Sequence, residues 1–225
     1  MAPYSSTTPS ALILVADGTE EIEFVTPYDV LTRAGFNVHS VGINTAVSVY
    51  ARCSRNVRIV LDSPSLAATP SSTVDAATIV ILPGGAAGSA AFCASEAALR
   101  LVREFRDEGK WVASICAATT ALVASVATHP DGAGEGQEGG GGGSGGQRES
   151  ARKVRVTSHP SVRAEVVAAG WEYADEAERV VVSGKVITSR GPGTALAFSL
   201  AIVEALAGRA KREEVMGPMI CAETL

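Results

Sequence analysis

Three short runs of almost wholly apolar residues restrict the fold of this chain more than any other feature. They lie at residues 11–16, 77–82 and 111–115. Apolar runs of this length, without polar alternation, are typical of strands that are buried on both faces of a parallel sheet. Stretches with a helical pattern, such as 96–108 and 195–207, alternate with them. The alternation predicts a single doubly wound α/β sandwich with a mostly parallel central sheet.

Cys116 lies where the apolar run 111–115 meets a helical stretch of small and apolar residues, 117–127. No turn residue separates the two, so the chain must pass from strand to helix at one residue, as in a nucleophile elbow. The N-terminus of the following helix would favour a thiolate at this position. A buried structural cysteine is the alternative, since free cysteine is among the most buried residue types.

Several polar or glycine residues follow other predicted strands. Glu23 lies in a helix predicted from Glu20 to Arg33, with Thr19 as its N-cap, and Gly84–Gly85 and His159 come directly after strands. Ligands of open α/β sheets bind beyond the carboxyl ends of the strands, so these groups are expected at one edge with Cys116. Taken singly, Glu23 could instead be a solvated charge and the glycine pair a plain loop.

Composition excludes several classes of function. The net charge of −5 argues against nucleic acid or an anionic membrane as partner, and no apolar run is long enough to span a membrane. The four cysteines are far apart and show no metal-binding spacing, and no dinucleotide or phosphate-loop motif is present. We therefore expect no metal and no cofactor, and reduced thiols in the cytoplasm, with the nucleus as a further location.

Two segments do not contribute to the predicted core. Residues 1–10 are rich in Ser, Thr and Pro without the pattern of a secretory signal, and are predicted to be a disordered tail before a domain at 11–225. Ten of the fifteen residues at 132–146 are glycine. This composition predicts a flexible insert at about 131–150 rather than a domain boundary, because too little chain follows it to form a second core.

Seven motifs occur in an order and combination that identify a family resemblance. They lie at residues 17–23, 33–35, 53–55, 82–85, 114–117, 156–160 and 188–194. With these motifs the chain resembles the DJ-one/PfpI family, and most closely its Parkinson disease protein 7 clade. The motifs span nearly the whole chain from residue 11 to about 218, apart from the glycine-rich insert.

The resemblance implies a flavodoxin-like homodimer with a cysteine site. The residues that it carries over are Cys116 as nucleophile, Glu23 as the carboxyl that hydrogen-bonds the sulfur, His159 as the nearby histidine, and Gly84, Gly85 and the amide of Ala117 as the lining of an anion pocket. Arg33 and Arg55 match arginines near the subunit contact. Ala118–Thr119 replaces the Gly-Pro that usually follows in the clade, and is expected to narrow the pocket or move the start of the helix.

The activity that the resemblance implies is that of a glutathione-independent glyoxalase, a lyase that converts methylglyoxal and water to lactate through a cysteine hemithioacetal and an enediol. A deglycase acting on early glycation adducts of proteins or nucleotides is one alternative. A non-enzymatic redox sensor or chaperone of oxidative stress is another. Among the cysteines, Cys116 is expected to react first, followed by Cys53 in its polar turn, ahead of Cys93 and Cys221.

Overall fold

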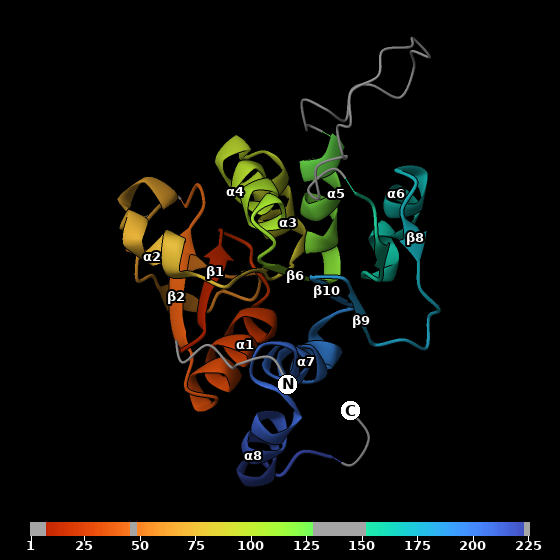
Figure 1. Cartoon of the computed structure of the whole chain (residues 1–225). Helices are drawn as coiled ribbons and strands as arrows, with labels where there is room; N and C mark the ends of the chain where they lie inside the picture. The colour runs from red at the N-terminus through yellow and green to blue at the C-terminus, as the bar shows by residue number, and fades with distance from the viewer. Residues whose placement is uncertain (1–7, 46–48, 128–151, 223–225) are drawn as a thin grey trace, which may run out of the picture.

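A six-stranded sheet forms the centre of the computed structural model, which describes residues 8–45, 49–127 and 152–222 (Figure 1). In spatial order its strands are β2 (Asn37–Gly42), β1 (Ser10–Val15), β5 (Ile79–Leu82), β6 (Trp111–Ile115), β10 (Val186–Ser189) and β9 (Val180–Ser183). All neighbours pair in parallel except β9, which runs antiparallel to β10. The predicted doubly wound sandwich with a mostly parallel sheet is confirmed.

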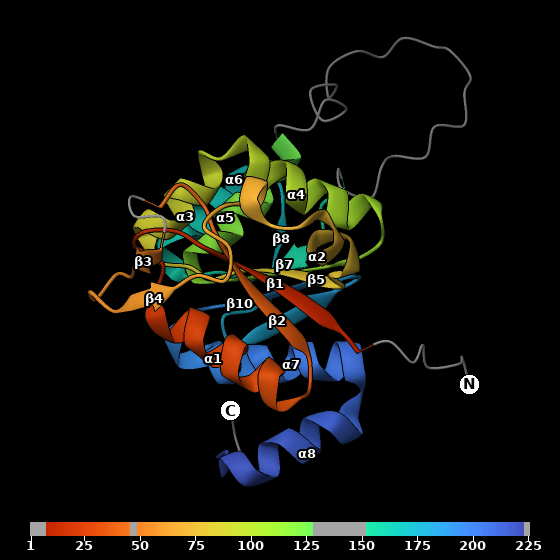
Figure 2. The same cartoon turned by 90° about the vertical axis from the view of Figure 1, so that its left-hand side faces the viewer.

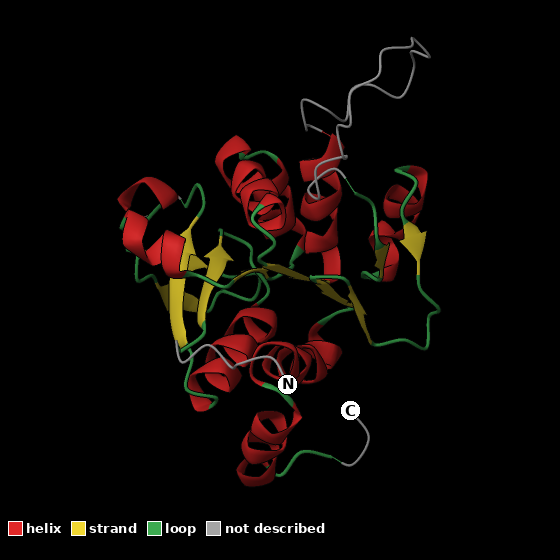
Figure 3. Ribbon diagram, in the orientation of Figure 1, coloured by secondary structure: helices red, strands yellow, loops and turns green. Residues whose placement is uncertain are grey.

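Helices cover both faces of this sheet, as the ribbon coloured by secondary structure shows (Figure 3). On one face lie α1 (Glu21–Arg33) and α7 (Ala195–Ala207), with α8 (Arg209–Met219) packed outside α7 (Figures 1 and 2). On the other face lie α3 (Ala86–Cys93), α4 (Glu96–Asp107), α5 (Thr119–Ala127) and α6 (Arg163–Ala168).

Two hydrophobic cores explain why the central strands are apolar without interruption. In β1, Ile13 packs in the core with α1 and α7, whereas Leu12 and Leu14 pack in the core with α4 and α5. Successive side chains of a strand point to opposite faces, and here each face is covered by helices.

Smaller elements surround the sandwich. A hairpin of β3 (Tyr50–Arg52) and β4 (Arg58–Val60) projects beside the start of α1 (Figure 2). The strand β7 (Arg155–Val156) pairs in parallel with β8 (Glu172–Tyr173) in a sheet of its own. β7 lies outside the main sheet, because β9 pairs with the edge of β10 on that side.

Several local expectations differ from the structure. The N-cap of α1 is Glu20, whose Oε2 accepts from the Glu23 amide at 2.9 Å, while Thr19 Oγ1 accepts from the Ala16 amide. Ser10, assigned to the tail, is the first residue of β1. The stretch 66–72 was expected as a loop or a frayed turn; it contains a 3-10 turn (Leu66–Ala68), but also the start of α2 (Ser71–Ala76), which was not expected.

The remaining tail residues 1–7 and the glycine-rich insert lie outside the described residues. Among the helices of the described residues, none combines the length and the apolar character that a membrane crossing requires.

Candidate active site

Cys116 occupies the junction between β6 and a 3-10 turn (Cys116–Ala118) that leads into α5. Its φ of +63° places a non-glycine residue in the left-handed region, which costs roughly 1–2 kcal/mol. The side chain is 8% exposed and lines a cavity. The structure therefore has the strand-to-helix elbow that the sequence predicted. Cys116 is not a cysteine sealed in the core.

Glu23 is carried by the first turn of α1 and is completely buried. Its Oε2 accepts a hydrogen bond of 2.7 Å from the Gly84 amide. Its other oxygen, Oε1, is buried without a nitrogen or oxygen partner in the described part of the chain, and the carboxyl interacts with the Cys116 thiol instead. Glu23 is thus not the solvated charge that a first-turn glutamate usually is.

The electrostatics of this pair are set by burial. Burial raises the pKa of Glu23 to about 7. Hydrogen bonds from Cys116 and Gly84 act in the opposite direction and lower this pKa, but burial is the larger effect. Burial, followed by the negative charge of Glu23, raises the pKa of the Cys116 thiol, whereas the amides of Ala117 and Gly85 lower it.

The helix N-terminus was expected to favour a thiolate at Cys116, but burial and Glu23 act in the opposite direction and raise the pKa of the thiol. The repulsion from Glu23 exists only while Glu23 is ionised. Protonation of Glu23 removes that repulsion and turns the carboxyl into a donor to the sulfur. Cys116 and Glu23 therefore titrate as a coupled pair, in which Glu23 gains or loses its proton near neutrality.

The two glycines after β5 have different roles. The amide of Gly84 is occupied by Glu23, so it is not free to bind a substrate oxygen as the resemblance implied. The amides of Gly85 and Ala117 approach the sulfur of Cys116. Gly85 has a φ of +89°, and a Cβ there would lie 2.2 Å from the Gly18 carbonyl oxygen. Of the three amides that the resemblance assigned to an anion pocket, those of Gly85 and Ala117 lie beside the sulfur, whereas that of Gly84 does not.

Ala118 and Thr119 do not narrow the cavity. Both are completely buried, and neither contributes to its lining. Thr119 Oγ1 donates instead to the Thr157 carbonyl at 3.1 Å, which ties the elbow to the segment that carries His159. The α-helix itself begins at Thr119, after the 3-10 turn.

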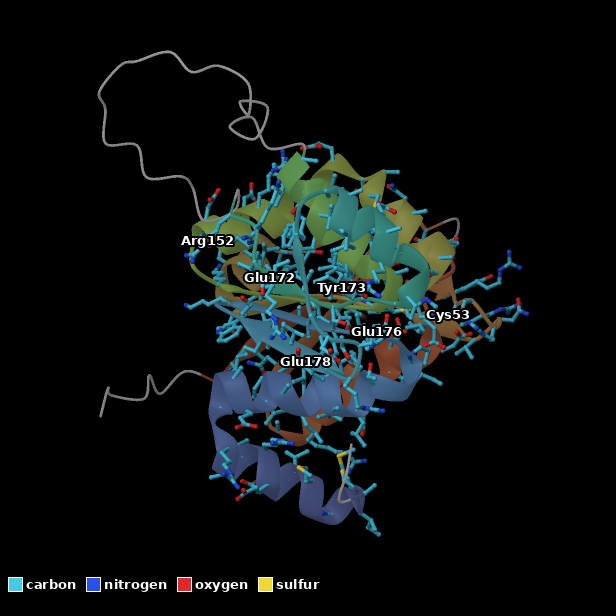
Figure 4. All side chains as sticks on the ribbon, turned by 90° about the vertical axis from the view of Figure 1, so that its right-hand side faces the viewer. Cys53, Arg152, Glu172, Tyr173, Glu176 and Glu178 are labelled. Carbon is cyan, nitrogen blue, oxygen red and sulfur yellow. The ribbon has the colours of Figure 1, made fainter. Side chains whose placement is uncertain are left out.

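His159 is brought to the elbow by its own backbone, since its amide donates to the Cys116 carbonyl at 3.2 Å. The exposed imidazole lines the same cavity as Cys116. The preceding residue, Ser158, is held by Tyr173 of β8, whose hydroxyl lies 3.0 Å from Ser158 Oγ (Figure 4). The small β7–β8 sheet therefore positions His159, although it lies outside the main sheet.

The cavity has a volume of about 800 Å³. Cys116, Ala117 and Gly85 lie on its wall together with His159, while Arg52 and Arg55 of the β3–β4 hairpin line its outer part.

Two arginines that the motifs contain are not part of this wall. Arg190 donates to the Glu176 carbonyl, and Arg33 pairs with Asp29 on the exposed side of α1 at 2.7 Å.

Five cavity residues lie outside the seven motifs: Arg52, Asn56, Ala86, Ala87 and Ser161. All but Ala87 directly adjoin a motif residue, and this adjacency was the only signal that the sequence offered for them. Glu20 and Pro192 lie inside motifs, but no role was assigned to them. The described residues contain no group of three or more His, Cys, Asp or Glu side chains that could hold a metal ion.

Comparisons with known proteins agree with this geometry. The family model described as DJ-1/PfpI family matches residues 9–129 and 147–205. Protein dj-1beta of Drosophila melanogaster is 38% identical over 213 residues, which are 95% of this chain and 97% of that protein. Glutathione-independent glyoxalase DJ-1 of Schizosaccharomyces pombe is 31% identical over 206 residues, 90% of this chain and 94% of that protein. The crystal structure of Drosophila melanogaster DJ-1beta superposes with a TM-score of 0.78 at 35% identity, covering 96% and 100% of the two chains.

Proposed function

This chain belongs to the DJ-1/PfpI family, and from that premise we propose that it is a glutathione-independent glyoxalase. It would convert methylglyoxal and water to lactate, and glyoxal to glycolate, as a lyase that needs no cofactor. The observation that carries the proposal is the buried pair of Cys116 and Glu23, in which Glu23 has a pKa of about 7 and the sulfur lies beside the backbone amides of Gly85 and Ala117. A similar protein from Schizosaccharomyces pombe bears the name of this activity.

The first step is addition of the Cys116 sulfur to the aldehyde carbon. The thiol proton passes to Glu23 as the carbon–sulfur bond forms, and the aldehyde oxygen then takes it to give a hemithioacetal. The amides of Gly85 and Ala117 are suited to stabilise the negative charge that develops on this oxygen.

The second step moves a proton between neighbouring carbons. Glu23, again a carboxylate, removes the hydrogen from the carbon bonded to sulfur, while the proton of the hydroxyl on that carbon moves to the neighbouring ketone oxygen, so that the anion of an enediol forms. Returning the proton to the adjacent carbon gives a lactoyl thioester on Cys116. A group with a pKa of about 7 is well matched to both halves of this transfer. Water then hydrolyses the thioester to lactate and restores the thiol.

A deglycase is the second candidate, and the size of the cavity favours it. A volume of about 800 Å³ exceeds what a three-carbon dicarbonyl fills, and leaves room for an adduct borne on a protein side chain or a nucleotide. The chemistry at Cys116 and Glu23 would be the same, so the two activities differ only in what occupies the outer cavity beside Arg52 and Arg55.

The test is lactate formation from methylglyoxal without glutathione, measured for the wild type, Cys116→Ser and Glu23→Gln. The proposal predicts loss of turnover in Cys116→Ser and a fall in kcat of at least about 100-fold in Glu23→Gln. Cys93→Ser is the matched control, because Cys93 lies on α3 and does not line the cavity. A wild type without turnover that nonetheless forms a sulfinate at Cys116 under peroxide would favour the redox-sensor alternative.

We further propose that the protein is a homodimer. Exposed apolar side chains gather where α1 meets the β3–β4 hairpin: Ile22, Val25, Val57 and Val60. Ser54 Oγ donates to Glu21 Oε2 at 2.7 Å and holds the two elements together. An apolar surface of this kind is a typical subunit contact.

A further inference from the structure

We propose that Ser161, through its backbone amide and its hydroxyl together, fixes His159 in the tautomer that carries its proton on Nε2. His159 would then present a hydrogen-bond donor to the substrate oxygen and would not act as a proton acceptor. This role rests on the proposed glyoxalase function, but the tautomer itself can be measured without substrate.

The geometry around Nδ1 carries the inference. The Ser161 amide donates to His159 Nδ1 at 3.2 Å, so the histidine side chain caps the 3-10 turn Pro160–Val162. A backbone N–H can only donate, and Nδ1 must therefore offer its lone pair. Ser161 Oγ also lies 2.8 Å from Nδ1, and its rotatable hydroxyl can act as a second donor.

A neutral imidazole carries one proton, which the turn thus assigns to Nε2. Nε2 lies on the ring edge away from Ser161, and within the described chain no hydrogen bond engages it. The ring lines the cavity, and its backbone is anchored to the Cys116 carbonyl.

His159 and Glu23 would then have different chemical roles. An Nε2–H beside the cavity is suited to bind the oxygen of a hemithioacetal or enediolate, as an addition to the amides of Gly85 and Ala117. Proton removal from carbon is left to Glu23 alone. Ser161 is a positioning residue, since it acts through His159.

The first experiment is two-bond ¹H–¹⁵N correlation NMR of the histidine rings in the reduced full-length protein at a pH where His159 is neutral, with His159→Gln to assign the signals. We expect the Nε2–H pattern for His159. An Nδ1–H pattern would overturn the proposal, whether or not the protein turns over methylglyoxal, so failure of the glyoxalase function remains distinguishable.

Ser161→Ala tests the positioning role. It removes one donor to Nδ1 but leaves the amide, so the ring signals should shift towards the Nδ1–H form, and Ser161→Thr should restore them. A purely structural residue would leave these signals unchanged. Ser65→Ala is the matched control, because Ser65 caps the 3-10 turn Leu66–Ala68 and does not line the cavity.

Kinetics separate a donor from a base. His159→Gln keeps an N–H donor near the place of Nε2 but cannot act as a base at neutral pH, whereas His159→Leu removes both functions. We expect kcat of His159→Gln to stay within about tenfold of the wild type and that of His159→Leu to fall about 100-fold. Equal losses in the two variants would contradict the donor role.

Discussion

Gly84 donates its backbone amide to Glu23 at 2.7 Å, so the turn after β5 holds a carboxyl that α1 supplies. A Cβ on Gly84 would lie 2.6 Å from Glu23 Oε2 and 2.7 Å from Cys116 Cβ. One glycine therefore leaves space for both members of the reactive pair and fixes the distance between them.

Gly84→Ala should consequently damage activity and stability together. The added methyl has to displace Glu23 or Cys116, and overpacking of this kind costs about 1–3 kcal/mol. We expect the free energy of unfolding, measured with urea, to fall by that amount and lactate formation to fall more than tenfold. Gly217→Ala is the control, since a Cβ there meets nothing within 4 Å and Gly217 lies inside α8. Full activity in Gly84→Ala would show that the pair tolerates displacement.

The raised pKa of Glu23 makes stability depend on pH. Its pKa goes from an ordinary 4.5 to about 7 in the folded state, so between these values the folded protein holds a proton that the unfolded chain has lost. The free energy of unfolding must then decrease as the pH rises from about 4.5 to 7, by roughly 3 kcal/mol from this group. Urea titrations of the wild type and Glu23→Gln across this range measure the difference. Parallel pH profiles would mean that Glu23 is ionised throughout.

The proposed subunit contact predicts a mass of roughly twice 23.0 kDa by light scattering at micromolar concentration. Val60→Glu places a charge on β4 at one of the most exposed apolar side chains, and Ile22→Glu does so on α1. Each should shift the protein to a monomer. Val167→Glu on α6, where the valine is 48% exposed against 52% for Ile22, should remain dimeric. A dimer that survives both changes would place the contact elsewhere.

The cysteines should differ in reactivity, and the structure alters the expected order. Cys116 opens into the cavity beside two amides and should be alkylated first. Cys53 was expected to follow, and it also lines this cavity, but it is only 3% exposed against 8% for Cys116; burial raises the pKa of both thiols to about 12, so exposure and not the pKa separates them. Cys221 is partly exposed and should react before Cys53. Timed iodoacetamide labelling with peptide mass spectrometry gives the order, and faster labelling of Cys53 than of Cys116 would contradict this assignment of the site.

Much of the fold was predictable because its determinants are local in the sequence. Residues 11–16 could be recognised as a doubly buried strand because every side chain is apolar, and residues 195–207 as a helix from composition and flanking turns. The elbow at Cys116 followed from the absence of any turn residue between a strand and a helix. These features depend on neighbours along the chain, so the sequence alone determined them.

Other features were decided only by the tertiary structure, because they depend on groups that are distant in the sequence. Gly84 and Glu23 are 61 residues apart in the sequence, so the packing of β5 against α1 decides whether the Gly84 amide faces Glu23 or the cavity. The burial that raises the pKa of Glu23 likewise comes from surrounding elements, and a first-turn glutamate is not buried by its own helix. The hydrogen bond between His159 and Ser161 is local in the sequence. It bears on the chemistry at Cys116 only because folding brings that turn beside Cys116. The sequence by itself thus determined the candidate site residues and the strands that carry them, whereas packing decided which amides lie beside the sulfur and how far the pKa of Glu23 is raised.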